Sequence, residues 1–106
     1  MPLWTFGTVE SELHVRLMDW RVMEATYADS AEPCTQHFVG CDSYGSGRVS
    51  SAIASLDIAR RRGVTKSGRV YELIGRWGGH SNADYVWRSF CEINGIESWT
   101  DAYQQV

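Results

Sequence analysis

Turns that contain glycine and lead into strand-like segments recur along this sequence, and they restrict its fold more than any other feature. The tetrapeptide Ser-Gly-Arg-Val occurs at 46–49 and again at 67–70. Glycine supplies the positive φ that a tight turn needs, and each Arg-Val begins a run suited to a strand. A strand-like segment at 36–41 precedes the first turn. This arrangement predicts hairpins and therefore an antiparallel sheet.

Two further segments near the N-terminus are typical of strands. Residues 3–9 alternate loosely between apolar and polar side chains, and residues 20–26 do the same. Just upstream of residue 20 the alternation loses its phase, which indicates an irregularity such as a β-bulge. The sequence therefore predicts a strand over 20–26 that does not continue smoothly backwards.

Residues 50–62 have two opposing interpretations. A serine at 50 or 51 can cap a helix that ends at Gly63, with three arginines in its last turn. Alternatively, residues 48–57 form the returning strand of a hairpin whose tip, at 57–64, carries those arginines. Local rules favour the two interpretations almost equally.

The segment 82–94 has the signature of an amphipathic helix. Ser81 or Asn82 can cap its start, and Asn94-Gly95 can end it. Its apolar face is predicted to consist of Val86, Phe90 and Ile93, with Trp87 at the flank. The tail from residue 97 onward is predicted to add at most one more amphipathic turn.

These elements predict an α+β fold in one domain, residues 1–106, with a curved antiparallel sheet of four to six strands packed against one C-terminal helix. A chain of 106 residues has room for one hydrophobic core. Its predicted members are Val22, Phe38, Val39, Val49, Ile53, Leu56, Val70, Leu73, Val86, Phe90 and Ile93.

Charge and cysteine content indicate which compartment and which kinds of partner to expect for the protein. The net charge of −3 is divided into −5 over 1–47, +5 over 48–88 and −3 over 89–106. No apolar run is long enough for a membrane helix, and the N-terminus lacks the basic and apolar pattern of a secretory signal. The cysteine count of three is odd, which favours a reducing compartment. We therefore expect a cytoplasmic protein without a membrane partner.

A basic cluster at the predicted hairpin tip is the first candidate binding site. It consists of Arg60, Arg61 and Arg62, with Lys66 and Arg69 nearby. Crowded guanidiniums favour an anionic partner, and phosphate of nucleic acid fits their planar geometry. The alternative is that these arginines pair with the protein's own carboxylates, and the acidic pI of about 5.5 opposes general binding to nucleic acid.

Trp77 is the second candidate for binding. It lies between Arg76 and two glycines, so the sequence predicts an aromatic side chain exposed on a loop. Exposed tryptophans are frequent anchors in protein interfaces, so Trp77 predicts a surface for a protein partner or for self-association.

Metal binding and catalysis have weaker support. Cys34, His37 and Cys41 could bind zinc, with Cys91 or His80 as a fourth ligand. On an extended strand, however, His37 and Cys41 face one side and Cys34 faces the other. The alternative is two small apolar cysteines and a partly exposed histidine, and no cofactor is expected. The sequence contains no G-x-S-x-G motif and no phosphate loop. No spacing singles out a nucleophile together with its base, so the sequence does not indicate an enzyme.

The segments 47–53, 56–57 and 65–73 together show a familiar pattern, which ends in T-x-S-G-x-x-Y-x-L and is followed by Asp84-Tyr85-Val86-Trp87-Arg88. Over residues 20–94 the chain resembles small bacterial accessory proteins of mobile elements, of the kind found in integron gene cassettes and phage genomes. The resemblance implies strand, turn, strand and then helix, and so favours a strand within 50–62. It implies no activity.

The leading functional prediction is a small non-enzymatic binding or accessory protein that acts through a protein surface, alone or as a homo-oligomer. The first alternative is a nucleic-acid contact module that uses the basic hairpin at 60–69. The second is a small zinc-bearing or catalytic domain centred on Cys34, His37 and Cys41.

Overall fold

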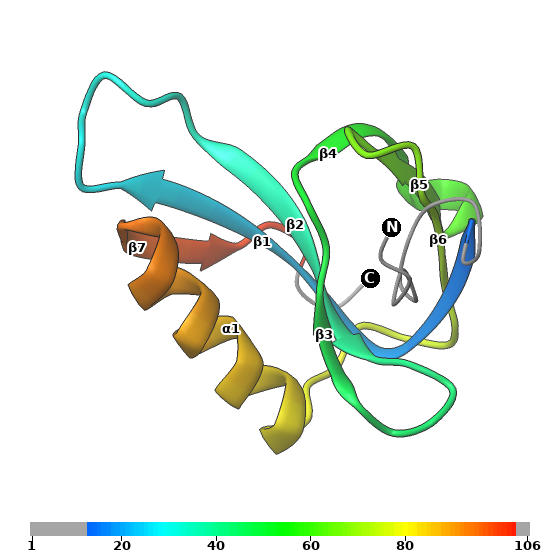
Figure 1. Cartoon of the computed structure of the whole chain (residues 1–106). Coiled ribbons are helices and arrows are strands. Elements are labelled where there is room, and N and C mark those ends of the chain that lie inside the picture. The colour runs from blue at the N-terminus through cyan, green and yellow to red at the C-terminus, as the bar shows by residue number, and fades with distance from the viewer. Residues whose placement is uncertain (1–12, 104–106) are drawn as a thin grey trace, which may run out of the picture.

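The computed structural model describes residues 13–103, and the predicted strand at 3–9 lies outside that range. The described chain is α+β, as predicted, with one helix and a mixed sheet of seven strands, more than the four to six expected (Figure 1). In chain order the elements are β1 (His14–Tyr27), β2 (Thr35–Cys41), β3 (Gly47–Val49), β4 (Ile53–Asp57), a 3-10 turn (Ile58–Arg60), β5 (Arg62–Thr65), β6 (Val70–Leu73), α1 (Ser81–Asn94) and β7 (Ile96–Asp101).

Strand β1 organises the sheet, whose order is β3-β2-β1-β6-β5-β4. One edge of β1 pairs with β2, whereas the other pairs first with β6 and then with β7. The β1–β6 pairing is parallel, so the expectation of a purely antiparallel sheet is wrong. The two strands are far apart in the chain, and no hairpin turn fixes their relative direction.

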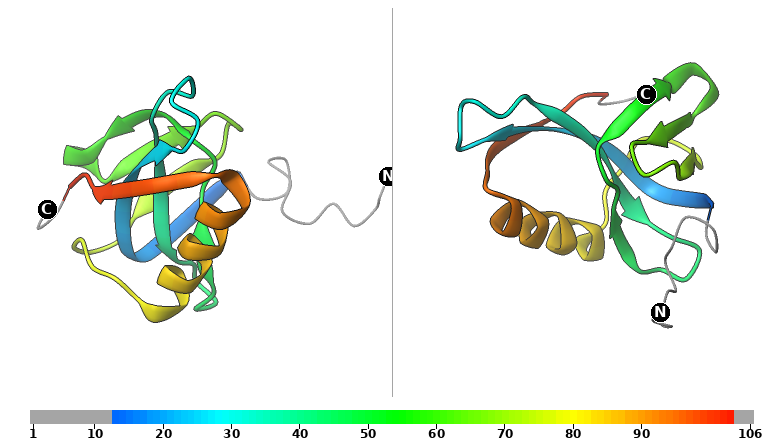
Figure 2. Two further views of the ribbon diagram at one scale, coloured as in Figure 1. Left: turned by 90° about the vertical axis from the view of Figure 1, so that its left-hand side faces the viewer. Right: turned by 45° about the horizontal axis from the view of Figure 1, so that its top comes forward.

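The predicted irregularity upstream of residue 20 is confirmed. Asp19 has a φ of 49°, and the register of β1 against β2 shifts between Met18 and Arg21. Because of this shift, the side chains that enter one core change from Val15 and Leu17 to Trp20 and Val22. A bulge of this kind bends the strand, and β1 accordingly curves through both halves of the sheet (Figure 2).

The strand interpretation of residues 50–62 is correct over 53–57, and the helix interpretation is wrong. The single strand predicted over 48–57 is two strands in the structure, because β3 pairs with β2 whereas β4 pairs with β5. At the division the buried hydroxyl of Ser50 accepts a hydrogen bond from Phe38 N at 2.8 Å, and Ser50 N donates to Phe38 O at 2.9 Å. The chain then passes from one half of the sheet to the other.

Helix α1 is confirmed, but it is not C-terminal. His80, and not Ser81 or Asn82, is its N-cap, and Gly95 ends it with a φ of 69° while donating to Cys91 O. The tail then forms β7 in place of a helical turn. The free edge of β1 offers backbone partners to this segment, and such a long-range pairing leaves no local sequence signal.

The apolar face of α1 differs from the predicted one. Its buried residues are Ala83, Trp87 and Cys91, whereas Ile93 is 82% exposed. Val86 and Phe90 are half-buried at the margin. The helix is therefore rotated so that the largest side chain, the Trp87 indole, faces the sheet.

Two cores lie on opposite faces of β1 and β2. Met23 and Val39 contribute to the core under α1, whereas Val22 and Phe38 contribute to the core enclosed by β4–β6. Glycine is required at Gly63 in the second core, because a Cβ there would overlap the Phe38 ring. Of the other predicted core residues, Leu73 is buried, and Val49, Ile53, Leu56 and Val70 are half-buried.

Candidate functional site

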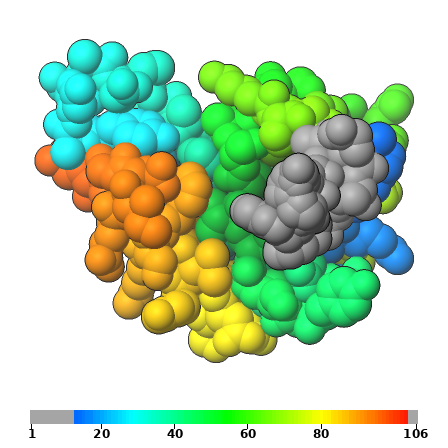
Figure 3. All heavy atoms as spheres, viewed as in Figure 1, coloured from blue at the N-terminus to red at the C-terminus, as the bar shows by residue number. Residues whose placement is uncertain are grey.

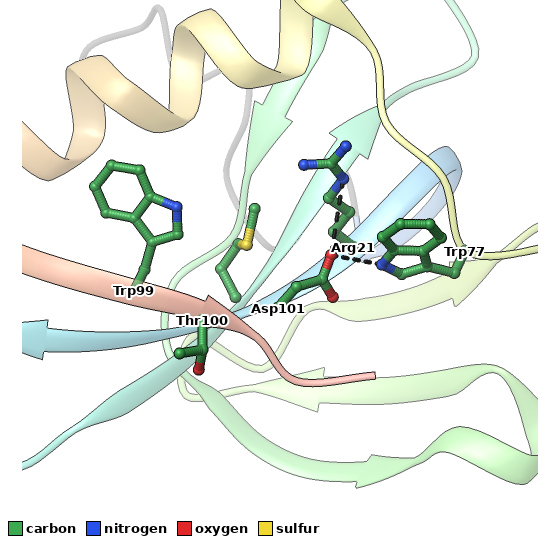
Figure 4. Close-up of a pocket in the computed structure, with 6 residues that line it drawn as sticks. Arg21, Trp77, Trp99, Thr100 and Asp101 are labelled. Carbon is green, nitrogen blue, oxygen red and sulfur yellow. Dashed lines mark hydrogen bonds and ion pairs between the residues drawn. The ribbon is translucent and has the colours of Figure 1, made fainter. Parts of the chain in front are cut away.

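A hollow of about 500 Å³ opens beside the end of β7, next to β1 and the segment that leads into α1 (Figure 4). Strand β1 contributes Arg21 and Met23 to its lining. The other lining residues are Trp99, Thr100 and Asp101 from β7 and Trp77 from the segment 74–80. We refer to these six residues as the Trp99 hollow.

The pairing of β7 with β1 sets the positions of the lining residues that β7 contributes. Asp101 lies opposite Met23 and Trp99 lies opposite Ala25, so both side chains share the helix-side face of the sheet. The register shifts between Thr26 and Tyr27, which leaves Glu97 as an extra residue in β7. Backbone bonds also hold the segment 74–80 along β1, since Ile74 N donates to Leu17 O and Gly78 N donates to Trp20 O, each at 2.9 Å.

Arg21 is fixed by contacts on several sides. Its Nε donates to Gly78 O at 2.9 Å, and its guanidinium lies 5.4 Å from the ring centroid of Trp77. It also lies 3.8 Å from one carboxylate oxygen of Asp101 and 3.8 Å from one of Asp84. Gly79 makes room for this arrangement, because a Cβ there would overlap the guanidinium.

Asp101 is the most buried charged group of the hollow, with 9% of its side chain exposed. Its Oδ2 accepts a hydrogen bond of 2.6 Å from Trp77 Nε1. Its Oδ1 is buried and has no hydrogen-bond partner among the described residues, and the same is true of Trp87 Nε1. A buried polar atom that also lacks a water partner costs roughly 1–3 kcal/mol.

The two indoles of the hollow differ in exposure. Trp99 is 40% exposed and packs edge-on against Trp87, with ring centroids 5.9 Å apart. Trp77, predicted to be the exposed aromatic, is half-buried against the second core. Sequence reasoning missed Arg21, Trp99 and Asp101. Reading the tail as a strand would have placed Trp99 and Asp101 on one face, because residues two apart share a face.

The basic hairpin does not bring its three arginines together. Arg61 has a φ of 56°, and its guanidinium turns back to donate to Ile58 O at 3.0 Å and lies 5.6 Å from the Trp20 ring. Arg60 is exposed beside Asp57, with Nε and Oδ2 3.6 Å apart. Lys66 is exposed, and Arg69 is half-buried in the same turn.

Arg62 belongs to a row of alternating charges across four strands. The register places Arg16 opposite Glu72, Glu72 opposite Arg62, and Arg62 opposite Asp57. Opposite charges that face one another across strands stabilise a sheet by roughly 0.2–1 kcal/mol per pair. The β4–β5 hairpin, in green in Figure 3, lies away from α1, which is orange and yellow. A role of the basic hairpin in binding stays a prediction.

The structure does not bring together the residues of the zinc alternative. Cys34 is exposed, with its Sγ 3.7 Å from Thr26 Oγ1, whereas His37 and Cys41 are buried. Cys91 lies on the buried face of α1, and the imidazole of His80 accepts a hydrogen bond from Asn82 N. Within residues 13–103, no three His, Cys, Asp or Glu side chains are placed to hold a metal ion.

The two buried thiols are poor nucleophiles near neutral pH. Burial raises the pKa of Cys41, with a further contribution from the charges of Asp19 and Asp42. Burial also raises the pKa of Cys91. Both groups therefore remain protonated near neutral pH and pack as small apolar side chains, because the thiolate is the nucleophilic form.

His37 is buried and not partly exposed as expected. Its Nδ1 lies 2.9 Å from Ser50 O, and its Nε2 lies 2.7 Å from Thr35 Oγ1. Its ring also contacts Trp87 and Phe90 of α1, with centroids 5.9 and 5.1 Å away. Burial lowers the pKa of His37, and the bond to Ser50 O opposes this in part.

We expect the free energy of unfolding to decrease as the pH falls below about 6.5. The unfolded chain gains a proton on His37 near its ordinary pKa, whereas the lowered pKa keeps the folded state neutral until the pH is lower. The slope from one proton is at most about 1.4 kcal/mol per pH unit. Urea unfolding between pH 7.5 and 5.5 measures it.

The variant His37→Gln should lose this part of the pH dependence. The control is His14→Gln, since His14 is exposed at the start of β1. If His37→Gln and the unmodified chain showed the same slope, burial of a neutral imidazole would not explain the pH dependence.

Comparison with known proteins gives no relative for this chain. It matches no protein-family model, and neither a curated protein nor a solved structure is significantly similar to it. The resemblance to mobile-element accessory proteins therefore stays a prediction. Within the described residues, α1 is too short and too polar to cross a membrane.

Proposed function

We propose that this protein is a small non-enzymatic binding protein that contacts a protein partner through the Trp99 hollow. The observation that carries the proposal is a hollow that places the indole of Trp99, 40% exposed, together with the guanidinium of Arg21, whose side chain is 29% exposed. Tryptophan and arginine dominate the energetics of protein interfaces, and both line this hollow.

The composition of the site supports a role in binding and not in catalysis. The six lining residues include no histidine, cysteine or serine. The buried thiols outside the hollow have raised pKa values, and both ring nitrogens of His37 lie within hydrogen-bond distance of other groups. Since the three cysteines are free, we place this role in the cytoplasm. An accessory role on a mobile element belongs to the same proposal.

Peptide display tests the proposal directly. A library of random dodecapeptides is selected on the immobilised full chain, and the selected peptides are then tested on Trp99→Ala and on Tyr44→Ala. Tyr44 is the matched control, because it is 91% exposed and lies on the turn between β2 and β3. We expect a peptide family that binds the unmodified chain and Tyr44→Ala equally, but binds Trp99→Ala at least about tenfold more weakly.

Two outcomes overturn the proposal. The first is the absence of any selected family, and the second is a family that binds Trp99→Ala undiminished. Sedimentation of the chain at increasing concentration identifies a second copy as the partner if a dimer forms that Trp99→Ala abolishes.

The nucleic-acid alternative is decided by a separate measurement. Binding of a labelled single-stranded oligonucleotide is followed at two salt concentrations, since phosphate contacts make affinity fall with salt. A salt-dependent affinity that Arg62→Ala reduces would favour the basic hairpin, and its absence would remove that alternative.

A further inference from the structure

Strand β7 has an open edge on the side away from β1. In an antiparallel pair, residues whose backbone groups bond across the pair alternate with residues whose backbone groups point away from it. Ala102 N donates to Val22 O at 2.8 Å, so the register turns the backbone groups of Thr100 toward β1 as well. The N–H and C=O groups of Trp99 and Asp101 therefore point outward. Within the described part of the chain, β1 is the one strand that pairs with β7.

The strands at the two ends of the order β3 to β4 are protected in ways that β7 is not. Helix α1 lies so close to β3 that a Cβ at Gly47 would overlap the helix backbone. Strand β4 has a register shift between Ile53 and Ser55, and such a bulge interrupts the regular row of backbone groups. Residues 96–101 contain no proline, lysine or glycine, and their register is regular over 98–101. Strand β7 is therefore the edge best suited to accept another strand.

The Trp99 hollow lies beside this open edge. Figure 4 shows the side chains of Trp99 and Thr100 on opposite faces of β7. Trp99 is 40% exposed, so a strand added to β7 would place one of its own side chains across from the indole. Aromatic side chains pair favourably with aromatic and β-branched side chains across neighbouring strands. The backbone of β7 would thus supply affinity, and the indole would select the side chain that faces it.

Charge argues against a second copy of this chain as the added strand. Residues 89–106 contain three carboxylates and no basic residue, and two of these carboxylates, Glu97 and Asp101, belong to β7 itself. Two copies of β7 side by side would bring these like charges together, which opposes pairing. The strand that fits this edge therefore belongs to a different protein and is not acidic.

We propose that the protein partner adds an extended strand to the outer edge of β7. The backbone of that strand exchanges hydrogen bonds with the N–H and C=O groups of Trp99 and Asp101, and one of its apolar side chains packs on the Trp99 indole. This inference rests on the proposed function, because it specifies how the partner of the Trp99 hollow binds.

Amide hydrogen exchange of the ¹⁵N-labelled full chain tests the pairing, with the tightest-binding dodecapeptide of the display selection as the probe. In the free chain, the amides of Trp99 and Asp101 should exchange rapidly, whereas that of Thr100, which faces β1, should be protected. Saturation with the peptide should slow exchange at Trp99 and Asp101 at least about tenfold. The amides of β4, at another edge of the sheet, are the control and should change less than about twofold.

A backbone variant separates strand pairing from contact with the indole alone. Residues 91–106 are synthesised with a methyl group on the backbone nitrogen of Trp99 and are joined to residues 1–90 by native chemical ligation at Cys91. The methyl group removes an outward donor and keeps both the indole and the pairing with β1. We expect this chain to bind the peptide at least about tenfold more weakly than the ligated chain without the methyl group.

The outcomes distinguish this inference from the proposed function. A peptide that depends on Trp99 but leaves exchange at Trp99 and Asp101 unchanged would overturn the added strand and keep the proposed function, as would full affinity for the methylated chain. Protection of both amides in the free chain would mean that the edge is already paired, which also contradicts the inference. A dimer that Trp99→Ala abolishes would replace the different protein with a second copy and overturn it. If no Trp99-dependent family is selected, the proposed function fails, and the inference fails with it.

Discussion

The variant Trp20→Ala is expected to lower the free energy of unfolding by about 4 kcal/mol, because it empties a large buried volume. Trp20 is fully buried and lies directly after the bulge at Asp19. Its Nε1 donates to Gly75 O at 3.2 Å, and its ring faces the Arg61 guanidinium. Alanine would leave a cavity and would also leave the backbone oxygen of Gly75 without its donor.

Urea unfolding followed by circular dichroism measures this loss. Trp99→Ala is the matched control, because Trp99 is 40% exposed and its removal should cost less than about 1 kcal/mol. Trp20→Phe should fall between the two, since it keeps part of the apolar volume but not the donor. Equal losses for Trp20→Ala and Trp99→Ala would contradict the position of Trp20 in the second core.

Arg21→Met is expected to lower the free energy of unfolding by about 2 kcal/mol, less than for a fully buried ion pair because the arginine is partly solvated. The change removes the cation beside a carboxylate that is only 9% exposed. It also removes the donor to Gly78 O. The double variant Arg21→Met with Asp101→Asn should recover about 1 kcal/mol, since a neutral amide needs no cation and still offers Trp77 Nε1 an acceptor.

Urea unfolding of the four proteins of this cycle measures the coupling between Arg21 and Asp101. The Asp57–Arg60 pair on the hairpin is the matched control, because its two side chains are 55% and 83% exposed. That pair should show no measurable coupling in the same cycle. If the losses from Arg21→Met and Asp101→Asn were simply additive, the two groups would not stabilise one another through their charges.

Local patterns explain the parts of the fold that the sequence predicts well. Asn94-Gly95 ends α1 because glycine adopts a positive φ there without cost. The phase break before Trp20 corresponds to the bulge at Asp19, since a single extra residue reverses the faces of a strand. Each of these features depends on residues close together in the chain.

The candidate site depends on residues that are distant in the chain. Arg21 and Asp101 are brought together by the pairing of β1 with β7, and Trp77 reaches them because the segment 74–80 follows the same edge of β1. The sequence singles out Trp77, but it does not indicate the half-buried position of that indole or its bond to Asp101. The rotation of α1 that buries Trp87 and exposes Ile93 likewise depends on the shape of the sheet beneath it.

The sequence by itself determined the turns, the C-terminal end of the helix, the bulge in β1 and the uneven distribution of charge, because each follows from the conformational preferences or ionisation of nearby residues. Only the tertiary structure decided that β6 runs parallel to β1, that the tail is a strand, and that an arginine, a carboxylate and two indoles share one hollow. The physical reason is that one strand edge can accept backbone bonds from several segments, and the choice among them is made by burial across the whole molecule.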